Sequence, residues 1–337
     1  MSPEPSVTAA PAVGAWLVTG GAGFVGSHLC DLLVAAGGSV TVVDDLSTGL
    51  RPNLAGAIGS GRAELLEATV SDALPRLAGR RFDGVFHLAA AVGVRLVVDD
   101  PVAAAETNLR ETMAALDFAA ASRVPFLLAS SSEVYGRGVR VPFREQDDLV
   151  FGAPTVSRWS YGLAKAVDEH LALARGRRDR FPVSVARLFN TVGPRQRGRY
   201  GMVLPRFVEA ALAGAPLEVH GTGRQVRCFC DVREVAAALA AMISSPACHG
   251  RPLNVGSDRP VTIEELAAEV LRVTGSSSGI RRVAHADVFG QAFEDLEIRV
   301  PDLAAIRAAI GFEPRIALPE TIAAVASAQA RLAGGVA

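Results

Sequence analysis

The sequence lacks an excess of charge of either sign, because 34 lysine and arginine residues stand against 35 acidic residues in 337. Without a basic stripe, the chain has no electrostatic footprint for a phosphate backbone, which argues against nucleic-acid binding. Long apolar runs are also missing. The longest, such as Val235–Ile243, fall well short of the roughly 18 residues that a membrane helix needs. Residues 1–13 contain no basic residue and so do not resemble a signal peptide. We expect a disordered leader there, on a cytoplasmic protein that does not bind membranes.

Cysteine is scarce as well, with four residues in the whole chain: Cys30, Cys228, Cys230 and Cys248. Such a set fits reduced thiols in an intracellular protein better than a disulfide framework. Cys228 and Cys230 flank one residue in an apolar stretch, and no nearby His or Cys pair completes a metal set. We therefore expect these cysteines to pack in the core, and we predict no metal site.

Lysine is nearly absent: Lys165 is the one lysine among the 34 basic residues. Arg and Lys exchange easily on a solvated surface, but not where a compact ammonium or a shiftable pKa is needed. The one position that has kept lysine therefore becomes a candidate for chemistry, with chance survival as the alternative.

Short β-branched runs alternate with longer segments rich in Ala and Leu from residue 15 to 190. This alternation predicts right-handed crossovers and an α/β fold with a Rossmann-type, doubly wound parallel sheet. After residue 190, Gly and Pro interrupt shorter helical segments, which predicts a smaller, mostly helical C-terminal domain that covers the carboxyl edge of the sheet. The expected strands are Ala15–Thr19, Ser39–Val43, a weaker Glu64–Ala68, Val85–Leu88, Phe126–Ala129 and Val183–Leu188, and the expected long helices are Phe24–Ala36, Pro101–Ala121 and Ser160–Ala174.

A glycine-rich turn follows the first predicted strand and leads into a helix. The spacing of Gly20, Gly23 and Gly26 allows a tight turn and close approach of the backbone to a pyrophosphate at the helix N-terminus. Asp44 ends the second strand, about where a ribose-binding carboxylate is expected. An acid there accepts hydrogen bonds from ribose hydroxyls and repels a 2′-phosphate. The pattern thus favours NAD over NADP. Arg51, further along the chain, is a weak indication in favour of NADP.

Tyr161 lies four residues before Lys165, so both side chains share one helix face. A tyrosine base at neutral pH needs its pKa of about 10 lowered by roughly three, which corresponds to about 4 kcal/mol. One ammonium about 4 Å away supplies that much at an effective dielectric near 20. The serines at the end of the fifth predicted strand, Ser130, Ser131 and Ser132, carry hydroxyls that could bind the substrate oxygen that Tyr161 deprotonates.

Together these motifs resemble the extended short-chain dehydrogenase/reductases, in their NAD-dependent nucleotide-sugar epimerase/dehydratase group. The resemblance spans about Trp16–Ile322. It rests on the segments GGAGFVGSHL, VDDLSTG, HLAA, SSSEVYG, YGLAK, ARLFNTVGP, GTGRQVRCFCDVRE and RVPD.

The resemblance implies a role for several groups of residues and a division of the chain. Residues 14–190 with about 230–260 would bind NAD, and residues 191–229 with about 261–333 would bind the nucleotide sugar. Family members are commonly dimers through the helices predicted at 101–121 and 160–174, so we expect a homodimer. The implied NAD contacts are Gly20, Gly23, Phe24, Val25, Gly26, Asp44, Leu88, Tyr161 and Lys165, and the implied UDP-sugar contacts are Ser132, Asn190, Arg227 and Arg299.

Three residues depart from the family pattern. Thr69 stands where an Asp usually lies near the adenine, Asp45 replaces a frequent Asn beside the ribose, and His220 replaces an aromatic residue often found near the nucleotide base.

Glu133 discriminates among the reactions of the group. Dehydratases resemble one another in an Asp-Glu pair, but here Ser132 precedes Glu133. The Ser-Ser-Glu triplet resembles UDP-glucuronate decarboxylases, in which Ser131, Glu133, Tyr161 and Lys165 would be catalytic. The predicted reaction is oxidation at carbon 4 followed by loss of carbon dioxide, which yields UDP-xylose or a released UDP-4-ketopentose. A UDP-sugar 4-epimerase is the alternative, and a non-catalytic NAD-binding module is a remote one.

Overall fold

A seven-stranded sheet organises the computed structural model, which describes residues 7, 13–90, 100–198, 202–284 and 296–334. Its strand order is β11-β6-β5-β4-β1-β2-β3, and all neighbouring strands are parallel. The predicted doubly wound α/β fold is therefore confirmed. The strands of this sheet are β1 (Ala15–Thr19), β2 (Ser39–Asp44), β3 (Ala63–Glu67), β4 (Gly84–His87), β5 (Phe126–Ser131), β6 (Val183–Leu188) and β11 (Arg251–Val255).

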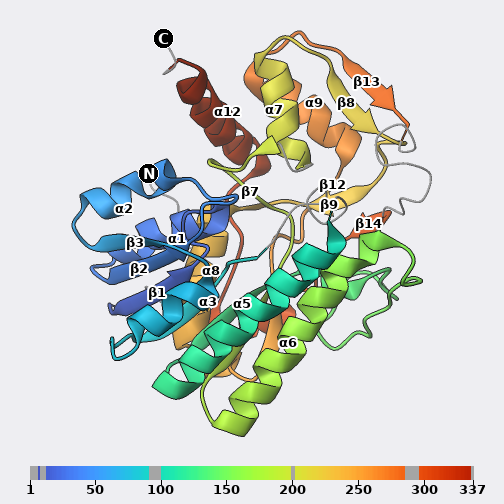
Figure 1. Cartoon of the computed structure of the whole chain (residues 1–337). Coiled ribbons are helices and arrows are strands. Elements are labelled where there is room, and N and C mark those ends of the chain that lie inside the picture. The colour runs from blue at the N-terminus through green and yellow to red at the C-terminus, as the bar shows by residue number, and fades with distance from the viewer. Residues whose placement is uncertain (1–6, 8–12, 91–99, 199–201, 285–295, 335–337) are drawn as a thin grey trace.

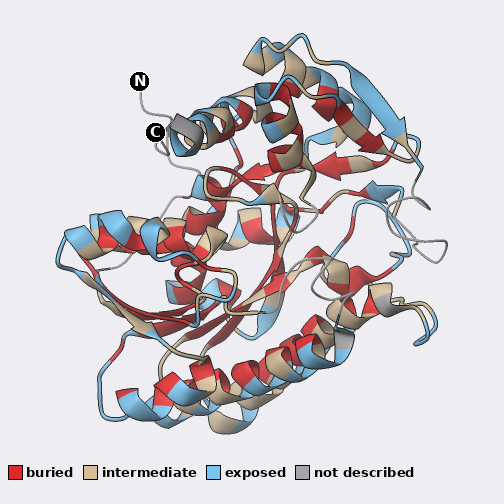
Figure 2. Cartoon of the chain, turned by 45° about the horizontal axis from the view of Figure 1, so that its top comes forward, coloured by how far each residue is buried: buried red, intermediate tan, exposed pale blue. Residues whose placement is uncertain are grey.

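Helices cover both faces of the sheet because successive strand residues point to opposite sides. In β1, Trp16 and Val18 join the core beneath α1 and α8, whereas Leu17 joins the core beneath α5 and α6. Figure 2 shows buried strands between partly exposed helices. The helices here are α1 (Phe24–Ala35), α2 (Ala55–Gly59), α3 (Val70–Ala73), α5 (Pro101–Ser122), α6 (Ser160–Asp179), α8 (Val232–Ser244) and α11 (Ala304–Ile310).

A smaller part lies over the carboxyl ends of the strands, as predicted (Figure 1). Its core joins α7 (Val203–Leu212), α9 (Ile263–Thr274) and α12 (Leu318–Gly334) through side chains such as Phe207, Leu266 and Ile322. Short strands supplement these helices, and their length of two to four residues explains why periodicity did not show them. They are β7 (Thr191–Val192), β8 (Leu217–His220), β9 (Val226–Cys228), β10 (Cys230–Asp231), β12 (Pro260–Thr262), β13 (Ile280–Val283) and β14 (Ile298–Arg299).

Element ends differ from prediction in two places that matter for the site. Strand β5 continues to Ser131, which places that hydroxyl at the last position of the strand. Helix α6 extends to Asp179 instead of Ala174, supported by an ion pair of 2.6 Å between Arg175 and Asp179. All four cysteines are buried free thiols. The predicted leader lies outside the described residues except for residues 7 and 13.

Candidate functional site

One cavity of about 720 Å³ lies at the carboxyl ends of the strands, between the sheet and the smaller part. In open α/β sheets this is the edge where ligands bind. Every residue predicted for catalysis, cofactor or substrate lines it: Gly20, Gly23, Phe24, Val25, Gly26, Asp44, Leu88, Ser131, Ser132, Glu133, Tyr161, Lys165, Asn190, Arg227 and Arg299.

The glycine turn forms a cradle that side chains would fill. Gly20 has φ +70°, and a Cβ there would lie 2.6 Å from the Ala89 nitrogen. At Gly26 a Cβ would lie 2.2 Å from the Gly20 carbonyl oxygen. Gly23 begins α1 with no side-chain cap, and the first turn carries no acidic residue. The N–H groups at this helix start are therefore open to an anion such as a pyrophosphate.

Asp44 ends β2 and lines the cavity. Its Oδ2 accepts from the Ala22 N–H at 2.9 Å and its Oδ1 accepts from the Leu46 N–H at 2.9 Å. A carboxylate has about four lone-pair sites, so both oxygens can still accept from ribose hydroxyls. Arg51, the predicted opposite signal, pairs instead with Glu67 at 2.6 Å and does not line the cavity. The geometry thus fits NAD better than NADP.

The three departures from the family pattern also receive local explanations. Thr69 caps α3 by accepting from the Asp72 N–H at 3.2 Å. Asp45 accepts from the Ser47 N–H at 3.0 Å, which fixes the turn after β2. His220 lines the cavity at the end of β8, and its Nε2 lies 3.0 Å from Nη2 of Arg206.

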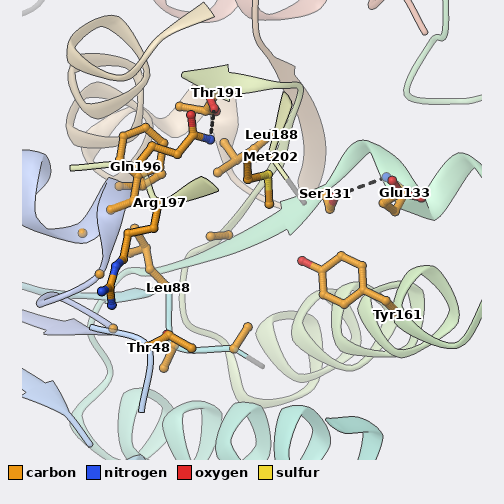
Figure 3. A pocket seen from close by; sticks show the side chains of 18 of the residues that line it. Thr48, Leu88, Ser131, Glu133, Tyr161, Leu188, Thr191, Gln196, Arg197 and Met202 are labelled. Carbon is orange, nitrogen blue, oxygen red and sulfur yellow. Dashed lines mark hydrogen bonds between the residues drawn. The ribbon is translucent and has the colours of Figure 1, made fainter. Parts of the chain in front are cut away.

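Tyr161 points its hydroxyl toward Ser131 across the cavity (Figure 3). Burial raises the pKa of Tyr161, and the negative charge of Glu133 raises it further, while a hydrogen bond with Ser131 lowers it. The pKa of Tyr161 therefore lies above its ordinary value. The sequence analysis had predicted the opposite, namely that the Lys165 ammonium lowers the pKa of Tyr161. Burial and the charge of Glu133 oppose that prediction, and a carboxylate beside Lys165 adds to the repulsion of the phenolate.

That carboxylate is Asp168, one turn further along α6. Nζ of Lys165 lies 3.6 Å from Asp168 Oδ2 and donates to the Ala129 carbonyl oxygen at 3.1 Å. Both side chains are almost completely buried.

Glu133 lies between two arginines, one of which sequence reasoning missed. Nη1 of Arg299 is 2.7 Å from its Oε1, and Nη1 of Arg158 is 3.1 Å from its Oε2. These cations outweigh burial and lower the pKa of Glu133 to about 2. The position of Arg158, three residues before Tyr161, could have marked it as a candidate site residue. Its ion pair with Glu133 could not be predicted, because the fold brings the two residues together.

Two donors on residues that line the cavity lack a hydrogen-bond acceptor among the described residues. Nε of Arg299 and Nδ2 of Asn190 are buried and make no hydrogen bond in the described part of the chain. Donors of this kind suit the oxygens of a diphosphate, a sugar or a carboxylate. Arg197, which the sequence analysis also missed, extends along the cavity toward the N-terminal strand-and-loop region in Figure 3.

The family model described as "NAD dependent epimerase/dehydratase family" matches residues 16–256. The chain belongs to this family. Its cofactor is NAD, and the glycine cradle and Asp44 are the residues that fit the pyrophosphate and the ribose. Within the described residues, no helix combines the length and apolarity required to span a membrane.

Relatives within the family include decarboxylases. A Bacillus cytotoxicus protein named UDP-N-acetyl-alpha-D-glucosaminuronate decarboxylase is 38% identical over 91% of this chain and 96% of its own. UDP-glucuronic acid decarboxylase 1 of Xenopus tropicalis is 34% identical over 90% of this chain and 69% of its own. Among solved structures, UDP-glucose 4-epimerase of Thermotoga maritima has a TM-score of 0.84 at 28% identity, over 95% of this chain and 99% of its own.

Proposed function

We propose that the protein catalyses NAD-dependent decarboxylation of a UDP-hexuronate, with UDP-glucuronate as the first candidate. The names of the Bacillus and Xenopus relatives support this reaction class, because both are decarboxylases of UDP-hexuronates. The Bacillus relative acts on a 2-acetamido sugar, so that analogue is the second candidate.

The observation that carries the proposal is the charge of the group formed by Glu133, Arg158 and Arg299. Two guanidinium groups and one carboxylate leave a net positive charge next to Tyr161. A neutral hexose has no group that needs this charge, whereas the carboxylate of a hexuronate does. Arg299 lines the cavity, and within the described residues its buried Nε makes no hydrogen bond, so its guanidinium has a donor left for such a carboxylate.

In the proposed reaction, each residue of the site has a separate role. Tyr161 takes the proton from the hydroxyl on carbon 4, and bound NAD supplies the acceptor for the hydride from the same carbon. The resulting β-keto acid breaks the bond between carbons 5 and 6, carbon dioxide leaves, and the electron pair moves into the ketone. Ser131 stabilises the developing enolate oxygen. Glu133 orients the sugar and the water that reprotonates carbon 5.

Purified protein with NAD and UDP-glucuronate labelled with ¹³C at carbon 6 should release labelled carbon dioxide. Mass spectrometry of the headspace and of the nucleotide product measures this directly. UDP-N-acetylglucosaminuronate in a parallel reaction separates the two candidate substrates. UDP-galacturonate of unchanged mass would show a 4-epimerase instead, and no reaction with either uronate would contradict the proposal. The product spectrum also shows whether UDP-xylose or the ketopentose is released.

We also propose a homodimer in the cytoplasm. The four free thiols support a reducing compartment. Large apolar side chains are exposed at i,i+4 spacing on both packed helices: Leu109 and Met113 on α5, and Leu163 and Val167 on α6. These four side chains form our candidate dimer face, because exposed apolar side chains on two packed helices are typical of an interaction surface.

Introducing charge on that face should dissociate the dimer. We expect Met113→Glu combined with Val167→Glu to reduce the mass in solution from two chains to one, measured by light scattering after size exclusion. Leu212→Glu, at an equally exposed position on α7, is the control and should remain dimeric. A monomeric native protein, or a double variant that stays dimeric, would rule out this interface.

A further inference from the structure

The chain's one lysine is an ammonium in a nearly closed environment. Lys165 is 2% exposed, and burial lowers its pKa. A desolvated ammonium stays protonated only if opposite charge or hydrogen-bond acceptors offset the loss of water. The Ala129 carbonyl oxygen at 3.1 Å supplies one acceptor, which carries no net charge. The structure must therefore provide an anion.

In the described ranges, three carboxylates influence Lys165 or Tyr161, and two of them are already paired with arginine. Glu169 accepts a bidentate contact from Arg187, with distances of 3.0 and 2.7 Å, and a hydrogen bond of 2.6 Å from Ser130. Glu133 is paired with two arginines, as described above. Among the described residues around Lys165, Asp168 is the carboxylate whose ion-pair partner is the lysine itself.

Asp168 depends on Lys165 in return. It is fully buried, and neither of its oxygens has a hydrogen-bond donor at normal distance in the described part of the chain. Burial raises its pKa, while the Lys165 charge and the Thr112 hydroxyl lower it. Each charge of the pair therefore favours the ionised form of the other and opposes the effect of burial, which disfavours both charges.

A buried polar row behind Asp168 is oriented to support the carboxylate. If the Thr112 hydroxyl offers its proton to Asp168, it must accept from Nε2 of His87, 3.1 Å away. Nδ1 of His87 then accepts from the Thr19 hydroxyl at 2.8 Å. This requires a neutral imidazole, and burial together with Lys165 lowers the pKa of His87 to about 3. The row runs from β1 through β4 and α5 to α6.

We propose that Asp168 is a positioning residue that keeps Lys165 protonated and holds its Nζ at the end of β5. The carboxylate is one helical turn from the lysine, it is the available counter-ion, and the Thr112 hydroxyl, which His87 contacts, favours its charged form. The importance of this for catalysis rests on the role proposed for Lys165, but the ionisation itself can be measured without turnover.

The single lysine allows a direct test. Cofactor-free protein labelled with ¹³C at lysine Cε gives one side-chain signal, and its shift against pH reports the pKa of Lys165. In Asp168→Asn the ammonium stays desolvated and loses its counter-ion, so the titration midpoint should move to lower pH. Asp179→Asn removes a carboxylate from the same helix at its far end and should leave the midpoint unchanged.

Thr112→Val provides a second measurement that keeps the carboxylate in place. It removes the hydroxyl that favours the charged form of Asp168. The titration midpoint of Lys165 should therefore move to lower pH, but by less than in Asp168→Asn. If Asp168→Asn does not fold, the titration midpoint of Thr112→Val alone tests the proposal. An unchanged midpoint in the folded variants would overturn the proposal.

Activity gives an independent readout. At a pH one unit above the midpoint, only about a tenth of the ammonium remains, so turnover by Asp168→Asn should decline at a lower pH than turnover by native protein. A shifted midpoint without carbon dioxide release from any form would support the role of Asp168 and reject the proposed reaction.

Discussion

Tyr161→Phe protein should bind NAD but fail to reduce it when UDP-glucuronate is added, with turnover lower by about 10³-fold. The substitution removes only the phenol oxygen, which faces Ser131 at the sugar end of the cavity. In the proposed mechanism this oxygen accepts the proton from the hydroxyl on carbon 4, so its removal blocks that step. Stopped-flow absorbance of the reduced cofactor measures the loss, and titration calorimetry with NAD checks that binding is retained.

Tyr135→Phe is the matched control for this substitution. Its hydroxyl donates to Oδ1 of Asn254 at 2.7 Å in the interior and does not line the cavity. The control should lose some stability and keep turnover within a few-fold of native. Reduction of the cofactor by Tyr161→Phe at near-native rate would show that another group is the base, and equal loss in both variants would indicate a structural effect.

The pH dependence of the native protein follows from the same geometry. Because burial and Glu133 raise the pKa of Tyr161, the phenolate is a minority species at neutral pH in the cofactor-free chain. Its fraction grows as pH rises, so kcat/KM should increase with pH along the acid limb. The positive charge of oxidised NAD favours the phenolate, which links base formation to the presence of the correct cofactor.

The sequence predicted the sheet well because its signal is local. Strands β1 and β6 begin and end where predicted, since both are largely buried runs, with glycine on either side of β1 and proline before β6. The glycine cradle and Asp44 were also predictable, because the βαβ unit fixes their relative position within about 25 residues.

Charge pairing across the cavity was not predictable in the same way. Arg299 reaches Glu133 from a position 166 residues away, and it does so because β14 pairs with β9 beside the site. Arg158 and Asp168 are near Tyr161 and Lys165 in the sequence. The same residues could equally lie on the surface, so the sequence alone does not show that they are buried. Their burial and partners decide their roles, and these depend on how α6 packs against β5 and α5.

Glu133→Gln should lower carbon dioxide release by about 10²-fold without raising KM for UDP-glucuronate. Glu133 pairs with Arg158 and Arg299, so in the proposed complex its carboxylate competes with the substrate carboxylate for these arginines. Glutamine removes this competition and increases the net positive charge, so the substrate carboxylate is held more tightly in the ground state. Carbon dioxide leaves as a neutral molecule, and tighter binding of the departing charge therefore opposes the bond cleavage.

Separate measurements of hydride transfer and decarboxylation distinguish this effect from damage to the fold. Removing the Glu133 charge should lower the pKa of Tyr161, so the acid limb for cofactor reduction should move to lower pH while NAD affinity stays within about two-fold of native. Glu209→Gln, on the exposed side of α7, is the control and should change neither step. A Glu133→Gln variant that releases carbon dioxide at the native rate would mean that the two arginines alone govern the carboxylate. A variant that loses NAD binding together with decarboxylation would instead assign Glu133 to holding β14 against η3 (Ser132–Tyr135), because its ion pair with Arg299 links these two elements.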